Sequence, residues 1–465
     1  MYNVAVGHQA GTAMTTGIYN TIVGGLAGDA LTIGNQNTAL GMLALSASVD
    51  GDSNTAVGFS ALRDYEDGDG NGHNTAVGSN SQVAATTGEF NTSLGSLSMG
   101  VGVVTGDNNV VVGHTAGQAL TSGASNVLLG KGAGTALTTG AYNIAIGHSC
   151  LSSEDGHGRN VAIGYAALNQ LNAGADGHNV AIGMESGKLM STGTNNVLIG
   201  GEAGDALTTG FGNIAIGRQA LSTEDTGNRN TAIGHNALSL LNYAGDGYNT
   251  AVGYTAGAAI TTGIQNTIIG GLSGAALTTG QRNVAVGYAA LQLEDAHGFN
   301  TALGYATLNA LNAGADAYNT AVGYNAGFSM TTGINNTLIG GLAGDALTTG
   351  TNNVALGQGA LTATTTAANN IAIGVSALGA NVLGASSVAI GLQSLAQQLP
   401  SSGTLMHNVC VGQKTGFAVT TGVQNTLIGG LAGDAIDTGD NNIIIGYNAA
   451  ASAVGVDNET VIGTA

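Results

Sequence analysis

The sequence is organised around Asn266-Thr267-Ile268-Ile269-Gly270, a stretch that recurs in closely related form along the whole chain. Each copy reads Asn, then usually Thr or Val, then two residues that are almost always apolar, then Gly. The 27 copies begin at residues 3 to 459, and the closing Gly is present in all of them. The leading Asn is replaced only at Ser387 and Glu459. The chain is therefore a repeat protein, and its period decides the fold.

Two periods are nested in the sequence. Most copies follow the preceding copy with a 17-residue period. A longer, 70-residue period is marked by Asn143, Asn213, Asn283 and Asn353, because each 70-residue unit holds three 17-residue repeats and one 19-residue repeat.

The spacing also suggests how the chain is divided. We expect regular repeats over residues 1-370, with the 70-residue unit clearest over 143-353. Residues 371-407 are expected to form irregular coils with a loop around Pro400, where proline is tolerated because the loop leaves the ladder. Regular coils return over 408-465.

Composition excludes several classes of protein. The 465 residues include 80 Gly, one Pro and no Trp, which is unlike a globular enzyme. A charged fraction of 8% and a periodic apolar pattern argue against disorder. The formal charge of −19 provides no basic footprint for nucleic acid or anionic lipid, so neither partner is expected. No apolar run reaches the length of a membrane span, so no membrane insertion is expected.

The two cysteines, Cys150 and Cys410, lie 15 repeats apart and cannot reach each other in a stacked array. Each replaces a small apolar residue of its repeat. Both are expected to be buried free thiols.

A 17-residue unit is too short for a helical-pair repeat or a propeller blade. Its first half places three β-branched or apolar residues between Asn and Gly, which predicts a short strand with a turn at each end. Its second half, such as residues 258–263, predicts another short strand closed by Gly. Two strands and two turns make one coil, so the sequence predicts an all-β solenoid of about 27 coils, stacked roughly 4.8 Å apart.

The repeated Asn and Gly have structural explanations. Gly at the fifth position permits a positive φ at a sharp corner, and identical amides stacked at strand spacing can bond along their column. Structural roles are therefore assigned to these columns and to the apolar residues between them. Representative members are Asn249, Gly253, Asn266, Gly270, Asn283, Gly287, Ile268 and Leu338.

Both faces of the short strand are apolar. One face can line the interior of the coil, but the other must be covered, because an exposed apolar ladder over 27 coils would aggregate. We expect copies of the chain to meet along these strands, and closed symmetry favours a homotrimer or a homodimer. Large residues at the third position coincide with Gly at the sixth, as in Ile268 with Gly271. This predicts that the two columns pack against each other where space is limited, so that a large side chain in one requires a small one in the other.

Units such as Asn249-Thr-Ala-Val-Gly-Tyr254, closing with Thr261-Thr-Gly263, resemble the repeats of phage tail fibres and large bacterial fibre proteins, many of which end in an endosialidase-type intramolecular chaperone. With a few extra residues per turn, they are also similar to the heads of trimeric autotransporter adhesins. The resemblance covers essentially the whole chain. It implies a left-handed parallel β-roll and an intertwined or side-by-side homotrimeric rod. The repeat at Glu459 looks like a passage toward a terminal domain, so we expect the chain to be part of a longer protein.

One segment matches a metal-binding pattern. Residues 67–72 read Asp-Gly-Asp-Gly-Asn-Gly, like the start of a calcium loop in which alternate oxygen donors converge. The match is partial, because the twelfth position of the loop is Gly78 where an EF-hand has an acidic residue. The candidate calcium ligands are Asp67, Asp69 and Asn71, and the alternative is a solvated turn. No other cofactor is expected.

Three acidic pairs recur in the 70-residue units, at Glu154-Asp155, Glu224-Asp225 and Glu294-Asp295. Paired carboxylates can serve acid-base chemistry or glycoside cleavage. Because these are adjacent in sequence and lie in a turn, we expect a solvated edge.

Two columns have possible binding roles. Tyrosines at the sixth position, among them Tyr254, Tyr288 and Tyr324, could stack on sugar rings if exposed, and the alternative is corner packing between coils. Threonine pairs such as Thr261-Thr262 and Thr278-Thr279 could form an ice-binding array. They stop after two successive coils, however, whereas an ice-binding plane should run unbroken.

Nothing in the sequence predicts an enzyme, because the nine histidines occupy unlike positions and no nucleophile or phosphate-binding motif is present. The leading hypothesis is a rigid trimeric shaft or adhesive rod of a phage tail fibre or bacterial surface fibre, located outside the cell or on a virion. The alternative is a module whose side binds a cell-surface glycan, a receptor or extracellular matrix. Ice binding is a third, less favoured hypothesis.

Overall fold

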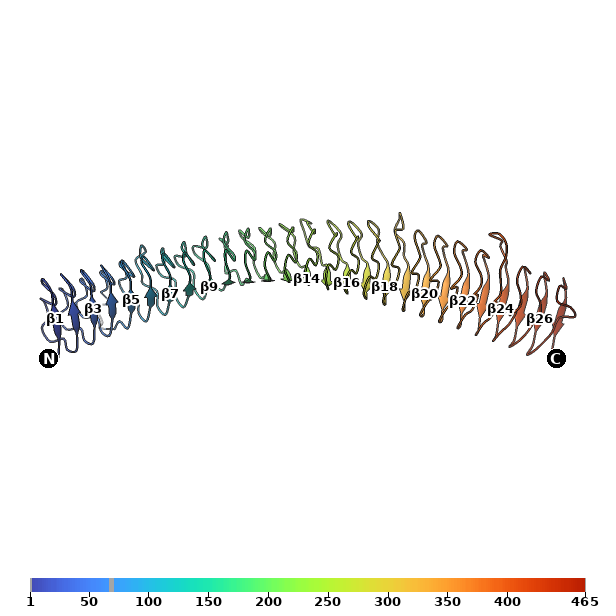
Figure 1. The fold of residues 1–465 in the computed structure, drawn as a ribbon, viewed down its shortest axis with the longest axis horizontal. Coiled ribbons are helices and arrows are strands. Elements are labelled where there is room, and N and C mark those ends of the chain that lie inside the picture. The colour runs from blue at the N-terminus through green and yellow to red at the C-terminus, as the bar shows by residue number, and fades with distance from the viewer. Residues whose placement is uncertain (1, 67–70, 465) are drawn as a thin grey trace. The chain divides into compact units, whose positions relative to one another are not determined.

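The computed structural model describes residues 2–66 and 71–464. These residues form strands and turns, and none of them belongs to an apolar helix of membrane-spanning length. The chain divides into two compact units, Met1–Asn230 and Thr231–Ala465. Each unit is a parallel β-solenoid in which every coil contributes one strand of three residues (Figure 1).

The first unit contains the strands β1 (Val4–Val6), β2 (Thr21–Val23), β3 (Thr38–Leu40), β4 (Thr55–Val57), β5 (Thr75–Val77), β6 (Thr92–Leu94), β7 (Val110–Val112), β8 (Val127–Leu129), β9 (Ile144–Ile146), β10 (Val161–Ile163), β11 (Val180–Ile182), β12 (Val197–Ile199) and β13 (Ile214–Ile216). The second unit contains β14 (Thr231–Ile233), β15 (Thr250–Val252), β16 (Thr267–Ile269), β17 (Val284–Val286), β18 (Thr301–Leu303), β19 (Thr320–Val322), β20 (Thr337–Ile339), β21 (Val354–Leu356), β22 (Ile371–Ile373), β23 (Val388–Ile390), β24 (Val409–Val411), β25 (Thr426–Ile428), β26 (Ile443–Ile445) and β27 (Thr460–Ile462).

Within each unit, consecutive strands pair in parallel and in register. Ile268 of β16 lies opposite Ala285 of β17, so equivalent repeat positions stack on one another. The predicted fold class, an all-β parallel solenoid in which each repeat forms one coil and most coils have the 17-residue length, is confirmed. The left-handed winding and the homotrimer remain predictions.

The predicted second strand of each coil is wrong. Residues 258–263 form turns and bends, although their backbone still bonds to the next coil, as in the 2.9 Å bond from Thr261 N–H to the Thr278 carbonyl. Left-handed corners bound this segment on both sides, at Gly257 (58°) and Gln265 (59°). In most coils the seventh, the ninth and the last residue, counted from the repeated Asn, have φ near +55°, as in Leu272 (59°), Gly274 (52°) and Arg282 (57°). An extended strand cannot pass through these corners.

The fifth-position Gly has the positive φ that the sequence predicts, and it also makes a close contact. Gly270 has a φ of 128°. A Cβ on this residue would lie 2.4 Å from the carbonyl oxygen of Gly287 in the next coil. Gly253 and Gly287 are equally restricted. Conformation and packing therefore exclude any side chain from this column.

The Asn column forms the predicted ladder, but through a more specific pattern. Asn266 is fully buried, and its Oδ1 accepts the backbone N–H of Asn283 at 2.9 Å. Its Nδ2 donates to the Gly280 carbonyl of its own coil at 2.9 Å, and to Oδ1 of Asn249 at 3.2 Å. Most members of the Asn column thus bond to the backbone of the next coil and also close their own coil across the interior.

The predicted sharing of volume between the third and sixth positions is wrong. The third residue is the middle of each strand and points into the core, where Ile268 and Leu338 are fully buried, whereas the sixth lies outside. A Cβ on Gly271 would meet only the Tyr288 ring, at 3.6 Å. The ninth position, and not the sixth, compensates for the volume of the third-position side chain. A Cβ on Gly274 would lie 3.1 Å from Cδ1 of Ile268.

The ninth position carries Leu in most coils whose third residue is Ala, as in Ala285 with Leu291, and Gly in coils whose third residue is large. Some coils have small residues at both positions, and their neighbours fill the space. A Cβ on Gly327 would lie 2.8 Å from Leu308 and 2.9 Å from Leu338, one coil before and one coil after. The 70-residue period therefore distributes core volume over successive coils.

The two outer residues of each strand remain partly exposed in the single chain. In β18 the middle residue Ala302 is buried, whereas Leu303 is 45% exposed. The fourth repeat position, to which Leu303 belongs, is Val, Leu or Ile in all 27 copies. An apolar outward column is therefore a constant feature of this solenoid, as expected from the sequence.

The corner geometry leads to a prediction for two adjacent glycines. Gly340→Ala should destabilise the protein by about 3 kcal/mol or more, because φ is +135° and the new Cβ would lie 2.6 Å from the Gly357 carbonyl. The matched control is Gly341→Ala, which meets nothing within 4 Å and should change stability by no more than about 0.5 kcal/mol. Urea unfolding followed by circular dichroism measures both. Equal effects would contradict the assigned role of the fifth position.

Candidate functional site

The tyrosines proposed as glycan ligands lie on the outside of the second unit. Tyr254, Tyr288 and Tyr324 are 61%, 51% and 57% exposed. The structure does not bring the three together. Tyr288 and Tyr324 are connected through Tyr305, whereas the coil of Gly271 separates Tyr254 from Tyr288.

One ring face of each of these tyrosines stacks on a neighbouring ring. The centroids of Tyr288 and Tyr305 lie 5.6 Å apart, those of Tyr305 and Tyr324 lie 5.5 Å apart, and Tyr254 stacks on His235. A sugar ring that binds by stacking needs a free aromatic face. One face of each ring therefore packs between coils, and on its other side the neighbouring coil has Gly271 or Gly341 at the sixth position. Glycan binding stays a prediction.

A second ladder of stacked side chains occupies the last position of neighbouring coils, directly before the repeated Asn. Arg282 lies over the Phe299 ring at 5.4 Å, and Phe299 stacks on Tyr318 at 4.9 Å. The sequence analysis missed the participation of Arg282, which could have been found by aligning the residues that precede each repeated Asn.

The threonine pairs have a structural use. The hydroxyl of Thr261 donates to the Thr278 carbonyl of the next coil at 3.3 Å, and Thr278 donates in the same way to Asp295 at 2.6 Å. In these two pairs only the second threonine, such as Thr262, is exposed. The exposed Thr279 hydroxyl also donates, to the Ala296 carbonyl at 3.3 Å, so three of the four hydroxyls in these two pairs bond to backbone. Ice binding stays a prediction.

The candidate calcium loop is largely beyond the described residues. Asp67 and Asp69 lie outside them. Asn71 is exposed, and its carbonyl accepts a hydrogen bond from the buried Tyr65 hydroxyl at 3.0 Å. Calcium binding at Asp67, Asp69 and Asn71 stays a prediction.

The prediction that the acidic pairs form a solvated edge is wrong for their glutamates. Glu154, Glu224 and Glu294 are fully buried at the twelfth repeat position, where most coils place an apolar side chain such as Leu277. Burial is possible because backbone N–H groups donate to the carboxylates. Glu154 accepts from His157 N–H at 2.9 Å and from Ala173 N–H, in the following coil, at 3.1 Å.

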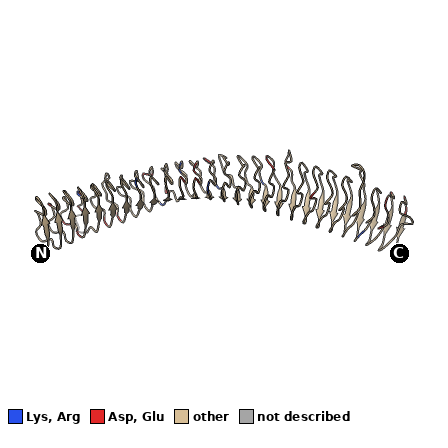
Figure 2. Ribbon diagram, in the orientation of Figure 1, with Lys and Arg blue, Asp and Glu red and all other residues tan. Residues whose placement is uncertain are grey.

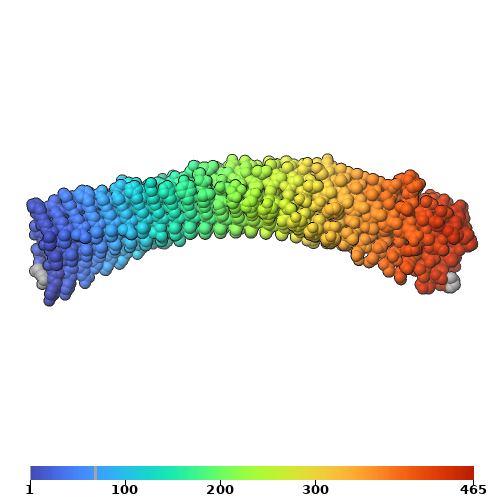
Figure 3. Space-filling model, viewed as in Figure 1, coloured from blue at the N-terminus to red at the C-terminus, as the bar shows by residue number. Residues whose placement is uncertain are grey.

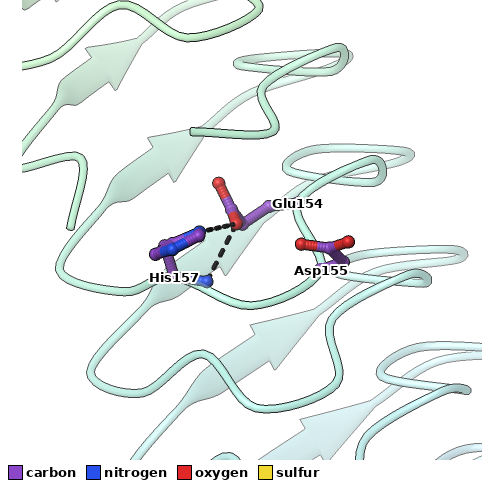
Figure 4. Close-up of side chains that lie close together, drawn as sticks. All are labelled: Glu154, Asp155 and His157. Atoms are coloured by element: carbon purple, nitrogen blue, oxygen red, sulfur yellow. Dashed lines mark hydrogen bonds and ion pairs between the residues drawn. The ribbon is translucent and has the colours of Figure 1, made fainter. Parts of the chain in front are cut away.

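Two of these pairs are joined by a histidine. Nδ1 of His157 lies 3.5 Å from Oε1 of Glu154, and Figure 4 shows Asp155 beside the same carboxylate. One donor atom from each of Glu154, Asp155 and His157 lies within 4.8 Å of the other two. The buried Nδ1 has no hydrogen-bond partner.

The same arrangement recurs in the second unit at Glu294, Asp295 and His297, again within 4.8 Å. Nδ1 of His297 lies 3.4 Å from Oε1 of Glu294 and is also buried without a hydrogen-bond partner. Burial raises the pKa of the Glu294 carboxyl, and N–H donation from His297 and Ala313 partly opposes this rise.

The sequence analysis missed the two histidines because it considered the acidic pairs alone. The shared pattern Glu-Asp-x-His-Gly at residues 154–158 and 294–298 could have revealed them. In the middle copy, Gly227 takes the place of the histidine and donates its N–H to Glu224 at 2.7 Å.

The described residues contain no cavity or cleft, and the visible face of each unit in Figure 3 has no deep hollow. Charged side chains are sparse along the ribbon of both units (Figure 2). In comparisons with known proteins, no family model matches the chain and no curated protein is similar to it.

Both cysteines are buried free thiols, as expected. Cys150 donates to the Gly147 carbonyl at 3.1 Å, and burial raises the pKa of its thiol to about 12. Burial also raises the pKa of Cys410. Neither thiol has the depressed pKa of a nucleophile or redox centre.

This burial predicts thiol reactivity. At pH 8, a thiol with the pKa of Cys150 holds about a thousandth of the thiolate of a free cysteine, so an aromatic disulfide reagent should react with the native protein extremely slowly. Two thiols per chain should react at once in guanidinium, which serves as the control. Rapid release of one equivalent from the native protein would contradict the burial of these side chains.

Proposed function

We propose that this protein is a structural fibre component, the trimeric shaft or adhesive rod of a phage tail fibre or bacterial surface fibre that serves attachment. The observation that supports it most is the use of the repeated polar groups. The buried Asn column, the first threonine of each pair and the buried Glu side chains bond to the backbone of their own or a neighbouring coil. Such a sequence is specialised for extending a regular scaffold.

The proposed trimer is supported by the outward apolar column. All 27 fourth-position residues are Val, Leu or Ile, and members such as Val6, Leu303 and Ile428 are 59%, 45% and 39% exposed in the single chain. Because the column repeats in every coil, copies of the same chain can cover it in register. Closed symmetry then limits the assembly to a few copies. The fibre would act outside the cell or on a virion.

Charge introduced into this column should separate the copies. The chain mass of 45.2 kDa gives about 136 kDa for three copies, and we expect that mass in sedimentation equilibrium. Ile269→Lys with Leu303→Lys should shift the protein toward the monomer, because two charges would be buried in the contact. The control pair, Thr279→Lys with Thr332→Lys, changes exposed residues outside the strands and should leave the trimer intact. A monomeric parent protein would refute the proposal.

A shaft should tolerate a change of length. Deletion of residues 283–352 removes one 70-residue unit and joins the coil of Ile268 to the coil of Asn353, a junction equivalent to the natural one after the coil of Leu338. We expect a folded protein of unchanged subunit number, shorter by about 19 Å in electron micrographs, since four coils are lost at roughly 4.8 Å each. The control deletion of residues 283–344 ends within a coil and should disrupt folding. Misfolding of the in-phase variant to the same degree would argue against an extendable shaft.

A further inference from the structure

We propose that Glu154, Asp155 and His157 bind a zinc ion, and that Glu294, Asp295 and His297 bind a second one. Each set combines two carboxylates with an imidazole nitrogen, and one donor atom from each residue lies within 4.8 Å of the others. Zinc takes oxygen and nitrogen ligands of these kinds, and three protein ligands with water complete a tetrahedral site.

The histidine nitrogen faces the carboxylate at a distance that suits a shared metal ion. Nδ1 of His157 and of His297 is buried and forms an ion pair with the Glu carboxylate, a contact longer than a good hydrogen bond. Each lies about as far from Glu Oε1 as two ligands of one zinc lie from each other, at 3.5 Å for His157 and 3.4 Å for His297. Bonds of about 2.1 Å at tetrahedral angles place ligands about 3.4 Å apart.

The carboxylates have capacity left for a metal. Each Glu oxygen accepts one backbone N–H, and a carboxylate oxygen has two lone pairs, so coordination through Oε1 need not break the bond to His157 N–H. Asp155 is exposed, so its side chain can rotate toward the other two donors. Two carboxylates and one dication leave no net charge, which offsets the cost of burying Glu154.

The imidazole distinguishes zinc from calcium and magnesium, which prefer oxygen ligands alone. It also distinguishes the three copies of the 70-residue unit. The middle copy has Glu224 and Asp225 but Gly227 in place of the histidine, so it lacks the nitrogen ligand. The proposal therefore assigns two zinc ions to each chain.

Zinc would act as a local cross-link between successive coils. The Glu154 carboxylate holds the N–H of Ala173 in the following coil, and Glu294 does the same for Ala313. A metal on the same carboxylate would connect the turn around His157 to the coil that follows it. This role does not depend on the proposed fibre function.

Isothermal titration of the full-length protein with zinc chloride tests the proposal. We expect two zinc ions per chain, one after His157→Ala or His297→Ala alone, and none after both. The control His114→Ala with His407→Ala removes exposed histidines elsewhere and should still bind two. Titrations with calcium and magnesium chloride should give much weaker binding.

A second variant separates binding from folding. Asp155→Asn with Asp295→Asn changes side chains that are exposed or partly exposed, so circular dichroism should be unchanged while zinc affinity falls by about tenfold or more. Absence of zinc binding by the parent protein would overturn the proposal. A stoichiometry of two that survives removal of both histidines would also overturn it.

Discussion

The structure depends on a buried asparagine that makes two kinds of bond in most coils. In Asn266 the amide oxygen takes the N–H of the next Asn, while the amide nitrogen holds a carbonyl of its own coil. Each such bond contributes about 1 kcal/mol net, but leaving its buried partners unpaired would cost more. The exception at Ser387 illustrates this constraint. Gln398 extends from the same coil, and its Oε1 accepts from the Ser387 hydroxyl and from Nδ2 of Asn408. A side-chain amide is therefore kept in the interior even where the repeat loses its Asn.

Keeping this interior in a short repeat forces the backbone into unfavourable conformations at the corners of each coil. Each coil must turn back within one short repeat, and most coils do so with left-handed φ at the seventh, ninth and last positions. Many of these residues are not Gly. Leu291 and Leu308 have φ of 52° and 49°, at a cost of roughly 1 kcal/mol or more each. They persist because the side chain fills the core space left by a small third residue. Sequence patterns predict the fifth-position corner, where only Gly is allowed, but cannot reveal corners at which packing outweighs conformational preference.

The difference between features set by residue type and features set by packing explains which parts of the structure the sequence could predict. The period, the strand around Ile268, the Asn ladder and the buried thiols follow from residue type and spacing alone. The second strand was a wrong expectation, because an apolar run ending in Gly looks alike whether it is extended or bent. The pairing of Ile268 with Gly271 was also wrong, because the correlation with the sixth position is real in sequence but the contact is with the ninth. Burial of Glu154 does not follow from the acidic pair alone, because it depends on backbone N–H groups of its own coil and of the following coil that donate to its carboxylate.

The buried glutamates are best understood together with coil length. A polar residue occupies the buried twelfth position before each coil of 19 or more residues: Ser48, Glu154, Glu224, Glu294 and Asn381 precede the coils at Asn54, Asn160, Asn230, Asn300 and Ser387. Extra residues displace backbone N–H groups from the regular ladder, and those groups still need acceptors. Glu154 and Glu294 supply them to Ala173 and Ala313, at the start of the inserted residues. At these two sites the insertion and the buried glutamate of the preceding coil thus form one structural unit, spread over two successive coils. Substituting an apolar residue for Glu294 would fill the core as in neighbouring coils but leave the longer coil without its acceptor.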